Sequence, residues 1–203
     1  MDHVIALGHS DIISERPFTH PSHTAADLSI LRYMVDQLCL ILEYPHMFAD
    51  LPQPLWLQQP SAHRLVIIQP DRLKVLGQLT VVGFFGQKRP DADPSLTDEF
   101  DNILIAEFPG HPDLLSYSTL ALDGGNFGNL VLFAHPEAKQ QWSRSNAHAQ
   151  AAGKLAPNYY ASVRIYNGFL PDGVKESKTL QVSRVKYFDY QNSPLWQAVR
   201  TMH

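Results

Sequence analysis

Residues 78–133 read QLTVVGFFGQKRPDADPSLTDEFDNILIAEFPGHPDLLSYSTLALDGGNFGNLVLF. The first part, residues 79–85, carries β-branched and aromatic side chains on both faces, which is typical of a central strand. Pro90 falls where that strand should end. A helix is predicted next, because apolar residues recur at helical spacing until Pro109 and Gly110 stop it.

The stretch continues with two more strands, which residues 115–122 and 129–134 predict by their apolar patterning. Residues 123–128, DGGNFG, have the composition of a hairpin turn. They lack the GK[ST] ending of a phosphate-binding loop and lead into a strand, so a nucleotide site is disfavoured. Residues 134–154 then predict one long helix, capped by Gly153, and residues 159–166 alternate as a further strand.

The resulting order, βαββαβ, predicts an α+β protein with a ferredoxin-like sandwich. Two helices should cover one face of a four-stranded antiparallel sheet and leave the other face open. Residues 179–190 predict an additional C-terminal strand, so we place the ferredoxin-like domain at residues 71–203.

Residues 1–70 form an N-terminal extension of this domain. Within it, residues 24–44 predict an amphipathic helix, because Thr24 and Asp27 resemble a capping box and leucines follow at spacings of three and four. Its apolar stripe should pack on the domain's own sheet or on a partner. Residues 4–7 are predicted to be irregular or a lone edge strand, and residues 65–69 a short strand.

Composition narrows the functional classes. The 203 residues include 44% hydrophobic ones and carry a net charge of −4, which disfavours binding to nucleic acid or to a membrane surface. No apolar run approaches the length of a membrane span, and the first residues do not resemble a secretory signal, so we expect a cytoplasmic protein. Cys39 is the only cysteine, which excludes an internal disulfide.

Three segments resemble the dimeric α/β-barrel superfamily, in particular the antibiotic-biosynthesis-monooxygenase-like (ABM-like) domains. They are FPG at residues 108–110 leading to LSY at 115–117, the run NLVLF at 129–133, and the helix bearing Trp142 and His148. The resemblance covers roughly residues 78–169.

The resemblance implies a homodimer, in which two sheets pack face to face, and a cavity that binds a small organic molecule. Similar proteins include cofactor-independent oxygenases, which makes an oxygenase-type oxidoreductase the expected enzyme class. They also include haem-binding and haem-degrading proteins. We therefore expect no cofactor, with haem bound through one histidine as the alternative. A third alternative is a non-catalytic binding or assembly module, for which the helix at 24–44 would supply the interface.

Residues 159–166 divide into two faces if the strand is regular. Tyr160, Ser162, Arg164 and Tyr166 then share a polar face that points to the open side of the sheet. Arg164 could there bind a carboxylate or stabilise developing negative charge, with Tyr160 and Ser162 contacting the ligand. The alternative for this face is contact with solvent and an interfacial ion pair.

Candidate groups for proton transfer are His148, His135 and Tyr166, and Tyr117 and Trp142 are further ligand-contacting candidates. On one continuous helix Trp142 and His148 would lie about 120° apart, which predicts that Trp142 is core and that His148 lies at the edge of the stripe. His135 precedes Pro136 and is predicted to cap the helix. No metal site is expected, because no histidine pair has a carboxylate at a known ligand spacing.

Overall fold

The computed structural model describes residues 4–44, 46, 54–58, 61–192 and 194–202. Its strands are β1 (Val4–Leu7), β2 (Leu55–Leu57), β3 (His63–Ile67), β4 (Leu79–Lys88), β5 (Leu114–Ala121), β6 (Phe127–Phe133), β7 (Tyr160–Leu170), β8 (Gln181–Asp189) and β9 (Trp196–Thr201). Its α-helices are α1 (Ser22–Leu42), α2 (Pro70–Val75), α3 (Ser95–Glu107), α4 (Pro136–Ser143), α5 (Asn146–Gln150) and α6 (Ala156–Tyr159).

All the described strands belong to one nine-stranded sheet with the order β1-β9-β8-β7-β4-β6-β5-β3-β2. Its centre, β7-β4-β6-β5, is antiparallel throughout and has the strand order of a ferredoxin-like sandwich. The predicted fold class is therefore confirmed. The strand predicted at residues 179–190 is β8, and the edge strand predicted at 4–7 is β1, which pairs in parallel with β9.

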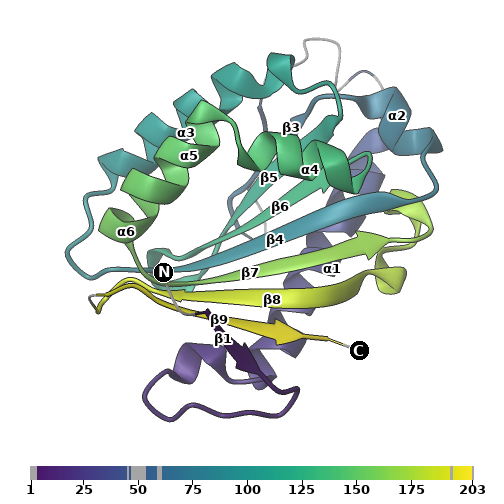
Figure 1. Cartoon of the computed structure of the whole chain (residues 1–203). Helices are drawn as coiled ribbons and strands as arrows, with labels where there is room; N and C mark the ends of the chain where they lie inside the picture. The colour runs from purple at the N-terminus through teal and green to yellow at the C-terminus, as the bar shows by residue number, and fades with distance from the viewer. Residues whose placement is uncertain (1–3, 45, 47–53, 59–60, 193, 203) are drawn as a thin grey trace.

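The two faces of this sheet are covered by different parts of the chain (Figure 1). Helices α3 to α6 lie over one face, which we call the helix-layer face, whereas α1 lies behind the sheet against the other, the α1 face. The largest hydrophobic cluster joins α1 residues to β4, β6 and β7 on the α1 face, and two smaller clusters lie under α3 to α6. The face that the sequence leaves open is thus filled by the chain's own N-terminal part.

Helix α1 uses its apolar stripe on this sheet. Its buried hydrophobic residues recur every three or four positions and are Leu31, Met34, Val35, Leu38, Ile41 and Leu42. Close approach is possible because β4 has Gly83 opposite the helix, where a Cβ atom would lie 2.6 Å from Leu31 Cδ1. The predicted helix at 24–44 is confirmed, and its stripe packs within the chain rather than on a partner. Among the described residues, no helix is both long and apolar enough to cross a membrane.

The single helix predicted at residues 134–154 is wrong. Helix α4 ends at Ser143, Ser145 is extended (φ −66°, ψ 154°), and α5 begins at Asn146. Ser145 Oγ accepts a hydrogen bond from His148 N at 3.2 Å, so its side chain starts a new helix. The predicted stop at Gly153 is also wrong, since a π-helical turn (Ala151–Leu155) and α6 carry the chain on to Tyr159.

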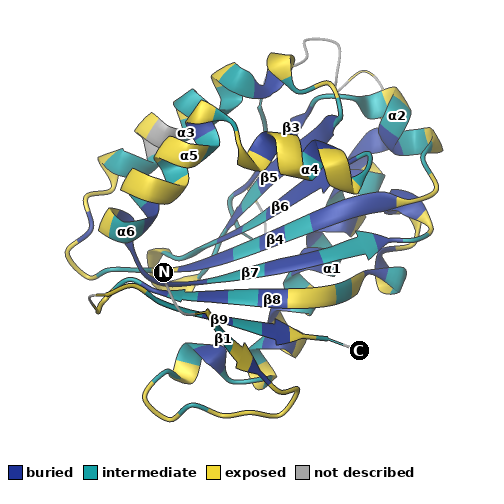
Figure 2. Cartoon of the chain, viewed as in Figure 1, coloured by how far each residue is buried: buried dark blue, intermediate teal, exposed yellow. Residues whose placement is uncertain are grey.

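Strands β8 and β9 extend the sheet beyond the helix layer, so their helix-layer face is left largely uncovered (Figures 1 and 2). Figure 2 shows the central strands β4 and β7 mostly buried or half-buried and part of β8 exposed. Arg184 of β8 is exposed and Lys186 is half-buried on this face. The helix layer therefore ends over β7, where the sheet becomes accessible.

Candidate functional site

The predicted strand face of β7 is occupied by α1. Arg164 donates to Asp27 through Nε at 2.6 Å and through Nη2 at 3.0 Å, and the hydroxyl of Tyr166 donates to Asp27 Oδ2 at 2.6 Å. Tyr166 is 1% exposed, and burial together with the Asp27 carboxylate raises its pKa. Arg164 thus binds a carboxylate, as its position predicts, but the carboxylate belongs to this chain. Roles for Arg164 and Tyr166 in catalysis stay predictions.

Tyr160 does not share that face, which corrects the predicted alternation. The pairing of β4 with β7 shifts between Gln87 and Lys88, so that Ser162 pairs with Gln87 but Tyr160 pairs with Lys88. This β-bulge turns the Tyr160 ring to the helix-layer face, where it lies against Gly86 and stacks edge-on with Phe84. Ser162 is buried and its hydroxyl donates to Gln87 Oε1 at 3.2 Å.

Tyr117 also lies on the helix-layer face, within a buried polar group that the sequence did not indicate. Arg64 of β3 forms an ion pair with Asp101 of α3 at 2.8 Å and lies 5.9 Å from the centre of the Tyr117 ring. The Tyr117 hydroxyl accepts a hydrogen bond from Asn129 Nδ2 at 3.3 Å. Burial, followed by the charge of Asp101, raises the pKa of Tyr117, which stays protonated at neutral pH.

Trp142 lies between two histidines under the helix layer. Its ring centroid is 4.9 Å from that of His111 and 6.1 Å from that of His148, both at edge-on angles. The predicted separation of Trp142 and His148 by about 120° is wrong, because it assumed the continuous helix that Ser145 interrupts. Trp142 is buried as predicted. The break brings the two candidate residues together.

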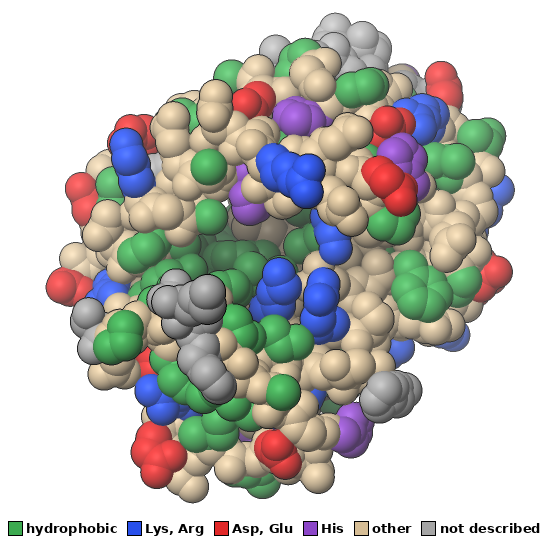
Figure 3. Space-filling model, viewed as in Figure 1, with side chains coloured by type: hydrophobic (Ala, Val, Ile, Leu, Met, Phe, Trp, Pro, Cys, Tyr) green, Lys and Arg blue, Asp and Glu red, His purple; other side chains and the backbone are tan. Residues whose placement is uncertain are grey.

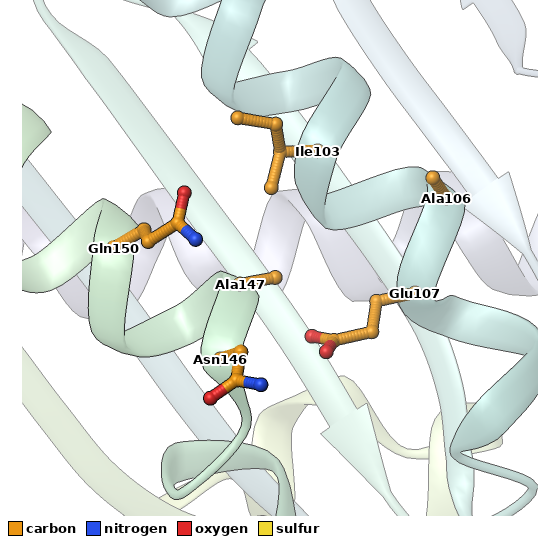
Figure 4. A pocket seen from close by; sticks show the side chains of 6 residues that line it. All are labelled: Ile103, Ala106, Glu107, Asn146, Ala147 and Gln150. Carbon is orange, nitrogen blue, oxygen red and sulfur yellow. The ribbon is translucent and has the colours of Figure 1, made fainter.

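Glu107 at the end of α3 is the acidic neighbour of His148. A shallow pocket of about 290 Å³ lies between α3 and α5, and Glu107, Asn146 and Gln150 are among the residues that line it. Figure 4 shows the Glu107 side chain extending from α3 toward α5. Glu107 Oε2 is buried without a hydrogen-bond partner among the described residues. Burial lowers the pKa of His148, and the Glu107 charge opposes this shift in part.

His135 caps α4, as predicted, since its Nδ1 accepts a hydrogen bond from Ala138 N at 3.3 Å. Its ring also contacts two carboxylates, Glu137 at 3.0 Å and Asp113 at 3.4 Å. The side chain lines a second pocket rather than the Trp142 cluster. A catalytic role for His135 stays a prediction.

The second pocket, of about 360 Å³, lies between α4 and the strands β4, β7 and β8. Lys139 reaches it from α4 and donates to Asn167 Oδ1 of β7 at 3.1 Å, and Arg184 of β8 lines it opposite. Figure 3 shows a hollow between the helix layer and the sheet, with hydrophobic side chains inside it and Lys and Arg side chains at its edge. Neither Lys139 nor Arg184 was singled out from the sequence.

Within the described ranges, no three histidine, cysteine or acidic residues gather as a metal site would require. The helix-layer face carries an imidazole beside a half-buried carboxylate, aromatic rings and a basic pocket.

No family model and no curated protein matches the sequence. Among solved structures, protein SO0527 from Shewanella oneidensis is 13% identical, with a TM-score of 0.40, over 46% of this chain and 94% of that one. A dimeric ferredoxin-like protein of unknown function from Thermobifida fusca is 14% identical, with a TM-score of 0.39, over 45% and 90%. SnoaB, a cofactor-independent oxygenase from Streptomyces nogalater, is 14% identical, with a TM-score of 0.36, over 46% and 90%. Each of these structures matches less than half of this chain.

Proposed function

We propose that this chain binds a small, partly aromatic organic molecule between the sheet and the helix layer, beside Trp142, His148 and Glu107. The observation that supports the proposal is the buried, unpartnered Oε2 of Glu107 among the described residues, next to a half-buried histidine. A buried carboxylate oxygen without a partner costs stability, and such groups concentrate at functional sites. The rings of Trp142 and Tyr117 both pack against Phe108, so the surroundings of the site are aromatic, which favours an aromatic ligand.

The reaction we propose for this site is oxygenase-type and needs no cofactor. His148 has a lowered pKa and is neutral at pH 7, so it can take a proton from a phenolic hydroxyl of the substrate. The resulting anion is electron-rich and transfers one electron to O2, the oxidant, which gives a substrate radical and superoxide. These combine at a ring carbon, the peroxide takes the proton back from His148, and loss of water leaves a quinone, so one oxygen atom enters the product and the other leaves as water. Glu107 stabilises the imidazolium that forms on His148, since a negative charge beside an imidazole favours its protonated form.

The test uses two probes of the same shape. Naphthol binding is measured by calorimetry, and oxygen consumption is followed with dihydroxynaphthalene as substrate. We expect His148→Gln and Glu107→Gln to lower the rate of oxygen consumption about 100-fold, the typical loss of a general base, while both bind naphthol. The matched control is His9→Gln, whose side chain is exposed and whose backbone oxygen accepts a hydrogen bond from Arg200 of β9.

Naphthol that binds equally well to a Trp142→Ala variant would contradict the binding site. Oxygen consumption that survives in both His148→Gln and Glu107→Gln would contradict the chemistry and leave a binding protein.

Haem is the alternative cofactor that the resemblance implies, and it stays a prediction. An absorbance titration of the purified chain with haemin tests it, since axial ligation by a histidine shifts and sharpens the Soret band relative to that of haemin alone.

The predicted homodimer also stays a proposal, and the position of α1 limits which surface could form it. Because α1 covers the sheet face through which such dimers pair, two copies of this chain would use another surface or displace α1. Light scattering on the full chain measures the mass directly. A cytoplasmic location remains the prediction from the sequence.

A further inference from the structure

Three cations gather at the edge of the helix layer in a chain whose net charge is negative. Lys139 projects from α4, and Arg184 and Lys186 lie on β8. Arg184 is paired across the sheet with Asn167, to which Lys139 donates a hydrogen bond, and Lys186 is paired with the half-buried Ile165. The side chains therefore meet on one face, over the same part of β7.

These cations lack acidic partners. Within the ranges that the structure describes, none of the three forms an ion pair with a carboxylate. The nearby carboxylates of Asp113 and Glu137 are instead directed to His135, and Asp113 also pairs with Arg72. Among the described residues, the positive charge at this edge therefore has no carboxylate within ion-pair distance.

The cations also repel one another. The pKa of Lys139 is lowered first by burial and then by the charges of Arg184 and Lys186, and the pKa of Lys186 is lowered by burial and by Arg184. Like charges held together in a partly buried place are unfavourable, and a bound anion removes that cost. Cations that only kept the protein soluble could be spread over the surface, where they would not repel one another.

The pocket beside them is suited to a small anion rather than to a polymer. Its volume is about 360 Å³, and the neutral donors Thr80 and Gln78 line it together with Lys139, Asn167 and Arg184. The basic group comprises only three residues, whereas a nucleic-acid surface needs an extended basic patch. Lys139 lies about one helical turn before Trp142, so α4 contributes a residue both to this pocket and to the aromatic cluster.

We propose that this basic pocket binds the anionic group, a carboxylate or a phosphate ester, of the organic molecule that the helix layer accommodates. Lys139 and Arg184 contact the anion, and Lys186 raises the local positive potential. The proposal deepens the proposed function, on which it rests for the aromatic part of the ligand. The substrate class is accordingly an aromatic acid or an aryl phosphate.

Calorimetry with a matched set of probes tests this: naphthol, hydroxynaphthoate, naphthyl phosphate and inorganic phosphate. We expect the wild-type chain to bind one or both anionic aromatic probes at least about tenfold more tightly than naphthol, as a charge-assisted hydrogen bond provides. Lys139→Gln and Arg184→Gln should each remove this preference without changing the affinity for naphthol. Lys178→Gln, which removes an exposed cation elsewhere, should retain it. The probe with the larger preference identifies the anionic group as carboxylate or phosphate.

The outcomes separate the two proposals. The anion site is overturned if the wild type shows no preference for the anionic probes, or if that preference persists in both variants. In either case, naphthol binding still upholds the proposed function. Phosphate that binds the wild type but not Lys139→Gln, in a chain that binds no naphthol, upholds the anion site and overturns the proposed function. Binding of none of the probes overturns both.

Discussion

Asp27 of α1 is 4% exposed and lies between two polar groups of β7, Arg164 and Tyr166. Removing one partner of a buried ion pair leaves the other charge without compensation, which typically costs about 3–5 kcal/mol. We therefore expect Asp27→Asn to lower the free energy of unfolding by about that amount, as measured by urea denaturation. Asp36→Asn removes an exposed carboxylate from the same helix and should change stability by less than about 0.5 kcal/mol. Equal effects of the two substitutions would show that the contact with Arg164 is energetically unimportant.

We expect the free energy of unfolding to depend on pH because of His63 in β3. Its side chain is buried, both ring nitrogens lack partners among the described residues, and burial lowers its pKa from 6.5 to about 4. Because the unfolded chain binds the proton more readily, stability is fully present above pH 6.5 and is lost as the pH falls toward 4. The loss should reach about 3 kcal/mol at the lower end.

Denaturation midpoints between pH 4 and pH 7.5 measure this loss, and the His63→Leu variant should show a flatter profile. His20→Leu, at a histidine near the start of α1, is the matched control. A His63→Leu profile as steep as that of the wild type would assign the pH dependence to other groups.

For single residues, the sequence predicted which strand face a side chain lies on, but not which side chain it contacts there. Arg164 and Tyr166 do point to the predicted side of β7, because alternation is a local property. Tyr160 does not, because the bulge beside Lys88 depends on the pairing of two strands distant in sequence. Glu107 and Lys139 were missed for a related reason, since only tertiary packing reveals a buried oxygen without a partner or an uncompensated cation.

Among the elements, the junction between α4 and α5 matters most for the candidate site. Ser145 Oγ accepts from His148 N, which starts α5 and sets the position of the His148 ring beside Trp142. We expect Ser145→Ala to cost about 1 kcal/mol of stability and to weaken naphthol binding, because the cap is lost and α5 can shift. Chemical denaturation and calorimetry measure the two effects.

Ser143→Ala is the matched control, since that hydroxyl donates to Gln140 O on an exposed part of α4. Loss of stability without any change in naphthol binding would contradict the positioning role of Ser145.

Helix and strand types were predictable from periodicity, whereas their connections across the sheet were not. The segments at 24–44, 79–85 and 129–134 each carry a strong local pattern and form α1, β4 and β6. The parallel pairing of β1 with β9 joins the two ends of the chain, and no local pattern specifies it. The break at Ser145 was visible only as a residue type that favours caps, in a segment otherwise compatible with a helix.

For the molecule as a whole, the N-terminal third completes the ferredoxin-like unit. It supplies β1, β2 and β3 to the sheet and α1 to the face that would otherwise be open. The apolar side chains beneath α1 include Val81, Phe85, Leu130 and Leu132, each no more than 3% exposed. Uncovering them would create a continuous apolar patch, and large patches of that kind drive association in water.

We therefore expect a variant whose α1 no longer packs on the sheet, but whose strands are all retained, to expose this apolar face. Leu31→Asp places a charge under α1, against β4, and burial of an unpaired charge disfavours the docked helix. We expect this variant to bind a fluorescent apolar dye and to self-associate, with a mass by light scattering of at least about twice that of a monomer, since two uncovered faces can pack together. Leu40→Asp, at an exposed position of the same helix, should behave like the wild type. A Leu31→Asp chain that stays the same size as the wild type and binds no dye would show that α1 is not what keeps this face from a second copy.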